Sequence, residues 1–112
     1  MSKSHGALSR FFRSLFSIGG GAKVKADLSI SQRENVPVII RYKNNRGQAS
    51  QRVLNVFGIG HGYIDAFDSR RSAVRTFKIN RIQWTELTES IFTIPDSYSP
   101  SGWVSAGLGE IN

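Results

Sequence analysis

The chain has 112 residues, of which 39% are hydrophobic and 21% charged, so it has room for one small domain with short extensions. It contains no cysteine, which excludes disulfides, thiolate metal sites and a cysteine nucleophile. The absence of cysteine fits a reducing compartment, and no apolar run reaches membrane-spanning length, so we expect a cytoplasmic protein without a membrane span.

The formal charge of +7 is unevenly distributed along the chain. Residues 36–82 carry nine Lys or Arg and two acids, whereas residues 83–112 carry four acids and no Lys or Arg. A compact basic segment of this kind predicts a polyanionic partner, of which nucleic acid is the commonest.

The first predicted element is an amphipathic helix over residues 7–18. Five large apolar side chains recur there at helical spacing. They are Leu8, Phe11, Phe12, Leu15 and Phe16. Arg13 interrupts the apolar run, which argues against a secretory signal. One interpretation is that this helix lies on a membrane surface or in a partner's groove. The other, which we favour, is that it packs its apolar side chains on the domain or on a second copy of the chain.

Glycines 19–21 are expected to end this helix and to supply a flexible joint. Residues 1–35 are therefore predicted to form an amphipathic helix and a flexible linker, residues 36–95 a β-barrel, and residues 96–112 a flexible tail. The tail is rich in turn formers, although its Trp103 is expected to dock somewhere on the domain.

Residues 36–95 predict a small five-stranded all-β barrel, because short alternating segments are separated by turn formers. The expected strands are the segment 36–44, then 50–57, 63–67, the stretch 70–82, and 90–94. The expected turns are 44–48, 58–62 and 68–72, with a short helical turn in 83–90. The glycines of 58–62 join two strands, so a turn explains them better than a phosphate-binding loop does.

The segment 70–82, RRSAVRTFKINRI, combines five basic side chains with apolar residues. On a strand, Arg75, Phe77, Ile79 and Arg81 share one face. We expect Phe77 and Ile79 to hold the fold, and Arg75 and Arg81 to contact a ligand. Neighbouring cations in the preceding turn would then contribute only general electrostatic attraction.

The sequence offers no catalytic or metal-binding group of residues. Asp65 and Asp68 are three apart on one strand and so point to opposite faces, which prevents them from acting as a carboxylate pair. Asp65 is expected to pair with a cross-strand arginine. His5 and His61 have no ligand partners at metal-binding spacing. We therefore predict a non-enzymatic protein without metal or cofactor.

Cations and aromatic residues alternate through the predicted barrel. The cations are Arg41, Lys43, Arg46, Arg52, Arg70, Arg71, Arg75, Lys78 and Arg81, and the aromatic residues are Tyr42, Tyr63, Phe67 and Phe77. Cations for phosphates and aromatic faces for bases are the components of single-strand recognition on a sheet. Tyr42 and Tyr63 carry polar tips, which favours surface or groove positions for them.

This pattern resembles the WYL domain family over about residues 34–98. The matching elements are Ile40-x-Tyr42, Gly47, Ser50-x-Arg52, Tyr63-Ile64-x-Ala66, Arg75-x-Phe77-Lys78-x-x-Arg81-Ile82 and Ser90-Ile91-Phe92-x-x-Pro95. Gly62, Asn55 and Asn80 stand where the family usually has tryptophan, proline and aspartate.

The resemblance implies an Sm-like, SH3-type barrel in a bacterial or phage regulator, where the domain senses a ligand such as single-stranded nucleic acid. It implies ligand-facing positions at Tyr42, Arg52, Tyr63, Arg75 and Arg81. Residues 1–35 are too short for the winged helix-turn-helix that usually precedes the domain, so the chain is similar to a stand-alone version.

Together these arguments predict a regulatory module that recognises single-stranded DNA or RNA, or a nucleotide-like anion, through a basic groove. The predicted groove residues are Arg41, Tyr42, Arg52, Tyr63, Arg75, Lys78 and Arg81, with Lys43, Arg46, Arg70 and Arg71 at its electrostatic periphery. The alternative is a protein-interaction adaptor, associated with a CRISPR or phage system, that works through the N-terminal helix and homodimerisation.

Overall fold

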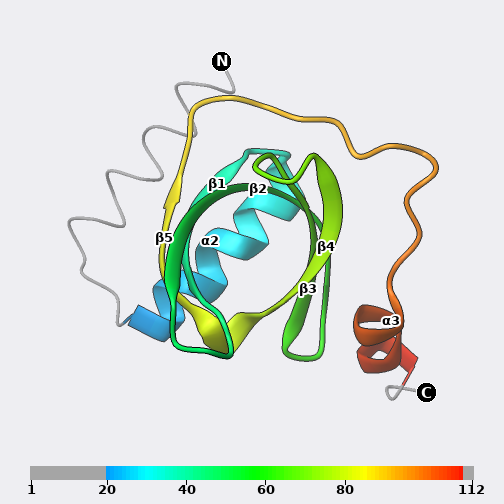
Figure 1. Cartoon of the computed structure of the whole chain (residues 1–112). Coiled ribbons are helices and arrows are strands. Elements are labelled where there is room, and N and C mark those ends of the chain that lie inside the picture. The colour runs from blue at the N-terminus through cyan, green and yellow to red at the C-terminus, as the bar shows by residue number, and fades with distance from the viewer. Residues whose placement is uncertain (1–19, 110–112) are drawn as a thin grey trace.

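The computed structural model describes residues 20–109, which form a curved antiparallel sheet around one helix (Figure 1). The elements are α2 (Gly20–Glu34), β1 (Val38–Lys43), β2 (Ala49–Gly60), β3 (Tyr63–Asp68), β4 (Ala73–Lys78), the 3₁₀ helix η1 (Ile79–Arg81), β5 (Ile82–Leu87) and α3 (Gly102–Gly109). The predicted fold class, an all-β domain of five strands with an N-terminal helix, is confirmed.

The sheet has the strand order β4-β3-β2-β1-β5, so β4 and β5 are its edges and it is not closed into a barrel. It curls strongly enough that the Tyr42 hydroxyl on β1 accepts a hydrogen bond of 3.3 Å from the backbone N–H of Lys78 on β4. The concave face carries the apolar core residues and meets α2, whereas the convex face points away from it (Figure 1).

The turns form where a polar side chain accepts hydrogen bonds from backbone N–H groups, or where glycine adopts a positive φ angle. The Asn44 side-chain oxygen accepts hydrogen bonds of 2.9 Å from the N–H groups of Arg46 and Gln48. Gly47 and Gly62 adopt φ values of +81° and +82°, which glycine reaches without steric cost. These turns fix the registers β1–β2 and β2–β3.

The core lies between α2 and the concave face of the sheet. Val24 and Leu28 of α2 pack on buried sheet residues. The sheet residues are Val38, Ile40, Leu54, Val56, Ile64, Ala66, Phe77, Ile82 and Leu87, with Ile79 packed against them. The prediction that Phe77 and Ile79 hold the fold is thus confirmed.

Helix α2 shows that the flexible linker predicted within residues 1–35 is wrong for residues 20–34. Its buried face includes two polar residues, Asp27 and Ser31, beside Val24 and Leu28, so the apolar periodicity is too weak to reveal it. Asn35, with φ +57°, ends the helix. The predicted helix over residues 7–18 lies outside the described residues.

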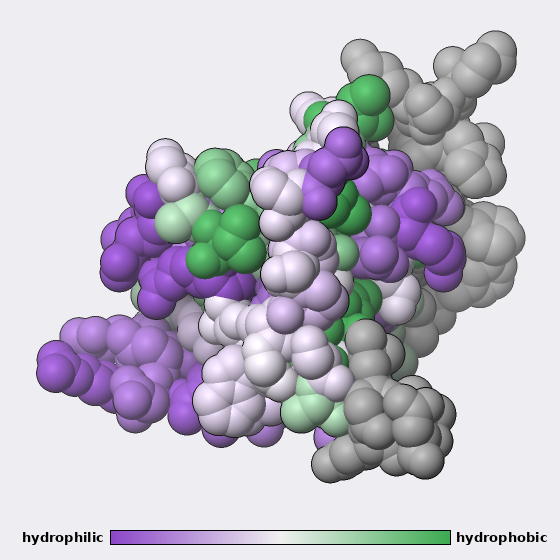
Figure 2. Space-filling view, turned by 90° about the vertical axis from the view of Figure 1, so that its right-hand side faces the viewer, coloured by the Kyte–Doolittle hydropathy of each residue, from purple (hydrophilic) through white to green (hydrophobic). Residues whose placement is uncertain are grey.

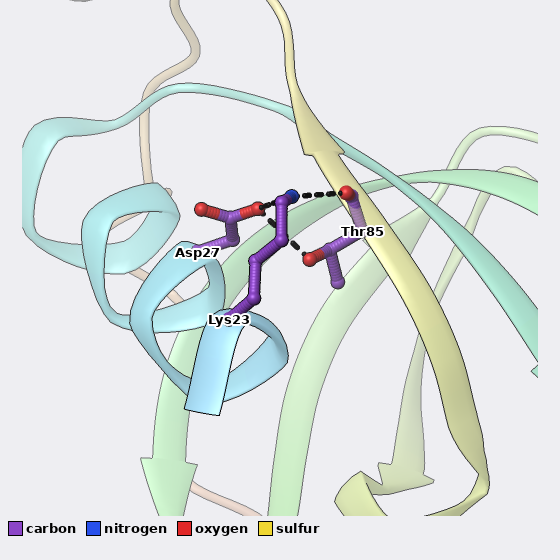
Figure 3. A network of polar contacts seen from close by, with 3 residues as sticks. All are labelled: Lys23, Asp27 and Thr85. Atoms are coloured by element: carbon purple, nitrogen blue, oxygen red, sulfur yellow. Dashed lines mark hydrogen bonds and ion pairs between the residues drawn. The ribbon is translucent and has the colours of Figure 1, made fainter. Parts of the chain in front are cut away.

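A polar network anchors α2 to the edge strand β5 (Figure 3). The Lys23 ammonium donates to the Asp27 carboxylate at 2.8 Å and to the backbone oxygen of Thr85 at 2.7 Å. The buried Thr85 hydroxyl donates to the same Asp27 oxygen at 2.8 Å. The inward-facing Asp27 is therefore hydrogen-bonded, as a buried carboxylate must be.

Three predicted strand boundaries are wrong. β2 continues through Gly58 to Gly60, so the turn is confined to His61 and Gly62 rather than 58–62. β4 ends at Lys78, because η1 interrupts the extended backbone. The fifth strand is Ile82–Leu87 rather than 90–94, and the helical turn precedes it instead of following it.

Candidate functional site

The strongest basic and aromatic grouping lies on the concave side of the sheet. We call Tyr42, Arg52, Arg75 and Phe77 the Tyr42 cluster. Arg75 is paired across strands with the buried Ala66, so it projects to the concave side, and it is exposed there. Its guanidinium carbon lies 5.9 Å from the centroid of the Phe77 ring. The Tyr42 ring meets Phe77 edge-on at a centroid distance of 5.1 Å.

Arg52 lies on the concave face of β2, because it is paired with the buried Ile40 of β1, and it is held by an ion pair. Its Nη1 lies 2.5 Å from the Asp68 Oδ2, and its Nε donates to the Ser50 hydroxyl at 3.2 Å. The Asp68 side chain is 0% exposed and that of Arg52 13% exposed, so the pair is largely shielded from water. Asp68 also accepts the N–H of Arg70 at 3.0 Å, which shapes the β3–β4 turn.

Arg52 and Arg75 therefore differ in how freely their guanidinium groups can bind an anion. Arg52 is oriented by Asp68, and an anion would share that guanidinium with the carboxylate. Arg75 forms no ion pair with any described residue, so its charge is available to a ligand.

The other predicted groove residues lie elsewhere. Tyr63 and Lys78 face each other across β3 and β4 on the convex side. The Tyr63 ring packs on Trp103 of α3 at a centroid distance of 5.0 Å. Arg41 projects from the convex face opposite Trp84 of β5. Arg81 belongs to η1 and lines a depression with Lys43, because the 3₁₀ turn takes it off the face that it would share with Arg75 on a strand.

Among the peripheral cations, Arg46 is exposed in the β1–β2 turn, and Arg70 and Arg71 are exposed in the β3–β4 turn. The seven predicted groove residues thus do not form one groove in the structure. They divide into the concave Tyr42 cluster, the convex pair Tyr63 and Lys78, and the cations Arg41 and Arg81 near the β1–β5 edge.

Sequence reasoning missed the role of the segment after β5. It runs around the outside of the sheet to α3, and Figure 2 shows this side, where pale, weakly polar surface lies between strongly hydrophilic regions. The buried Asp65 receives hydrogen bonds from the Tyr98 hydroxyl at 2.7 Å and from the Ser101 N–H at 2.8 Å. The Thr76 hydroxyl donates to its other oxygen at 2.9 Å. The predicted arginine partner of Asp65 is therefore wrong.

Asp65 and Tyr98 each shift the pKa of the other. Burial by itself would raise the pKa of Asp65, but the hydrogen bonds from Ser101, Tyr98 and Thr76 outweigh it and lower the pKa below its ordinary value. Burial, and then the hydrogen bond to Asp65 and its negative charge, raise the pKa of Tyr98 above its ordinary value. Asp65 is thus a carboxylate that holds the C-terminal segment on the sheet.

Two glycines of β2 allow this segment to approach. A Cβ on Gly58 would lie 2.3 Å from the Tyr98 hydroxyl oxygen, and one on Gly60 would lie 2.4 Å from the backbone oxygen of Val104. Val104 is 1% exposed. The predicted flexible tail 96–112 therefore contains a packed helix, and Gly-x-Gly in a strand was the signal for it.

One further cavity, of about 610 Å³, lies between α2 and the β2–β3 turn. Its lining is mainly apolar and contains none of the predicted groove residues. No group of three or more His, Asp or Glu residues in 20–109 could hold a metal ion. No helix in this part of the chain is long and apolar enough to cross a membrane.

Comparisons with known proteins agree with this architecture. The family model of the WYL domain matches residues 24–87. A solved structure, proteasome accessory factor B/C (PafBC) of Arthrobacter aurescens, is similar in fold, with a TM-score of 0.67 and 22% sequence identity over 85% of this chain. The aligned region makes up 15% of that chain. No curated protein matches the sequence significantly.

Proposed function

Because the chain belongs to the WYL domain family, we propose that it is a non-enzymatic regulatory module that binds single-stranded nucleic acid or a nucleotide-like anion. The concave Tyr42 cluster is the proposed anion site. The observation that carries the proposal is the exposed guanidinium of Arg75, which forms no ion pair with any residue in 20–109, on the same concave face as the guanidinium of Arg52 that Asp68 orients. Arginine binds phosphate oxygens through two parallel hydrogen bonds, which makes such a pair suited to a phosphodiester chain.

The charge distribution supports a polyanion as the ligand. Residues 36–82 carry nine of the fifteen Lys and Arg residues of the chain. A phosphate chain that contacts several of them releases condensed counterions, so binding should weaken steeply with salt. Arg81 and Lys43 at the end of the sheet would extend the contact beyond the cluster.

A salt-titrated binding series with single-stranded DNA, single-stranded RNA and duplex DNA tests the proposal. We expect single strands to bind better than duplex, and the double variant Arg75→Ala, Arg81→Ala to lose most of that binding while its circular dichroism spectrum is unchanged. Each lost phosphate contact should reduce the slope of log K against log salt by about one unit.

The double variant Arg70→Ala, Arg71→Ala is the matched control, because it removes the same charge from an exposed turn. We expect it to lose less affinity. If both double variants weaken binding equally, the interaction depends only on net charge and the proposed site is wrong. The alternative, an adaptor that works through residues 1–19, predicts loss of a protein partner or dimer when those residues are deleted.

A further inference from the structure

Trp84 is a large aromatic side chain that β5 presents on the convex face of the sheet. It is 42% exposed, whereas its neighbour Thr85 is 1% exposed and faces α2. The register pairs Trp84 with Arg41 of β1, and Arg41 in turn with Gln51 of β2. An indole ring on a sheet surface, directly opposite a guanidinium, is not needed by the core on the other face.

Two depressions that share one lining residue extend from this ring toward the end of the sheet. One depression of about 550 Å³ is lined by Arg41, Gln51, Gln83 and Trp84. A second, of about 310 Å³, is lined by Lys43 and Arg81 among others and shares Gln83 with the first. We call the two depressions together the Trp84 groove.

The Trp84 groove has the chemistry of a strand-binding surface. The indole face can stack on a base, and the charges of Arg41, Lys43 and Arg81 can contact the phosphates on either side. The amides of Gln51 and Gln83 can hydrogen-bond base edges. The groove lining contains no acid, and the nearest acid on the same strand face is Glu86, two residues beyond Trp84.

The Tyr42 cluster offers less stacking surface, because Tyr42 is only partly exposed and its ring meets Phe77 edge-on. Phe77 is 3% exposed, and Arg75 already lies over its ring. We therefore propose that the Trp84 groove is a base-stacking site for single-stranded nucleic acid, in which one base packs on Trp84 and its flanking phosphates contact Arg41 and Arg81. This inference rests on the proposed function and adds a second binding surface to it.

A duplex should not use this groove. Its bases are already stacked in the helix interior, so the indole ring would gain no partner unless the duplex opened. The groove thus supplies a physical reason for a preference for single strands, which the cations by themselves do not.

The test compares two probes of equal charge, an oligothymidylate of about 12 nucleotides and an abasic strand of the same length. Full-length wild type, Trp84→Ala and Trp84→Phe are titrated with each at fixed salt. We expect Trp84→Ala to weaken binding of the oligothymidylate by between about fivefold and a hundredfold. It should leave binding of the abasic strand unchanged, and Trp84→Phe should keep most of the affinity.

Fluorescence gives an independent readout. The chain has two tryptophans, so Trp103→Phe leaves Trp84 as the only tryptophan, and the oligothymidylate should quench its fluorescence when tryptophan is excited selectively. Val74→Ala, which alters an exposed apolar residue on the opposite edge strand, is the control for a general surface effect.

The outcomes separate the two proposals. If the wild type binds neither probe, the proposed function and this inference both fail. If the wild type binds and Trp84→Ala binds the oligothymidylate equally well, this inference alone fails. If Trp84→Ala weakens binding of both probes equally, the ring has only a structural role and this inference also fails. If the Trp84 variants lose affinity and Arg75→Ala does not, the groove is the site and the Tyr42 cluster is not.

Discussion

Replacing Gly60 with alanine should displace helix α3 from the sheet. The added Cβ would lie 2.4 Å from the backbone oxygen of Val104 and 2.5 Å from its Cα. Non-bonded carbon atoms pack at about 3.5–4.0 Å, so α3 has to withdraw by about 1 Å or more. Because the obstructing atoms belong to the backbone, rotation of a side chain cannot relieve the clash.

The cost follows from what the displacement exposes. Full burial of a valine side chain contributes about 1.5–3 kcal/mol, and overpacking at a tight contact costs about 1–3 kcal/mol. We expect Gly60→Ala to lower the free energy of unfolding by about 1–3 kcal/mol, the upper end corresponding to complete loss of Val104 burial. Denaturant unfolding measures this value, and limited proteolysis should show faster cleavage between residues 95 and 109.

Gly21→Ala is the matched control. Nothing lies within 4 Å of a Cβ at that position, and Gly21 is in helix α2, where alanine is the better residue by up to about 1 kcal/mol. Its stability should therefore be unchanged or higher. The reasoning is refuted if Gly60→Ala is as stable as wild type, or if it is destabilised while cleavage of the C-terminal segment is unchanged.

Three further substitutions test the buried polar contacts. The pKa of Asp65 is lowered in the folded state, so its ionisation stabilises the fold at pH values above the ordinary pKa of 3.8. This stability is lost as the pH falls through the folded-state pKa. When the free energy of unfolding is measured against pH in acid, Asp65→Asn should therefore show less pH dependence than wild type. Arg52→Ala leaves the Asp68 carboxylate buried without its partner and should cost about 3–5 kcal/mol in thermal or denaturant unfolding. Thr85→Val removes a buried donor to Asp27 and should cost about 1–2 kcal/mol, whereas an unchanged midpoint would show that this hydrogen bond adds nothing.

The strands were the most predictable part of the fold. β1 alternates apolar and polar residues, and Asn44 with Gly47 marks the turn that follows. Such local patterns record both the extended backbone and the face that is buried. Helices α2 and α3 were not predictable in this way, because α2 buries Asp27 in its packed face and α3 is short and rich in small residues.

The candidate site was predictable in its residue types and not in its arrangement. Arg75 and Arg81 would share a face on one continuous strand, but η1 lies between them and separates them. Between Val56 and Gly58 a register shift in β2 changes the alternation, which turns the buried Phe57 toward Tyr98, at a ring-centroid distance of 5.3 Å. The rule that alternate residues of a strand share a face fails at η1 and at the register shift in β2, since the rule assumes an uninterrupted strand.

By itself the sequence determined the all-β class, the concentration of positive charge in residues 36–82, the anchoring role of Phe77 and the membership of a family, because each depends on composition or on short-range spacing. Only the tertiary structure decided which cations share a face of the sheet. Curvature of the sheet brings Tyr42 to β4, the ion pair with Asp68 occupies Arg52, and the pairing of β5 with β1 sets Trp84 beside Arg41. Those contacts join residues far apart in the chain, and no local pattern specifies them.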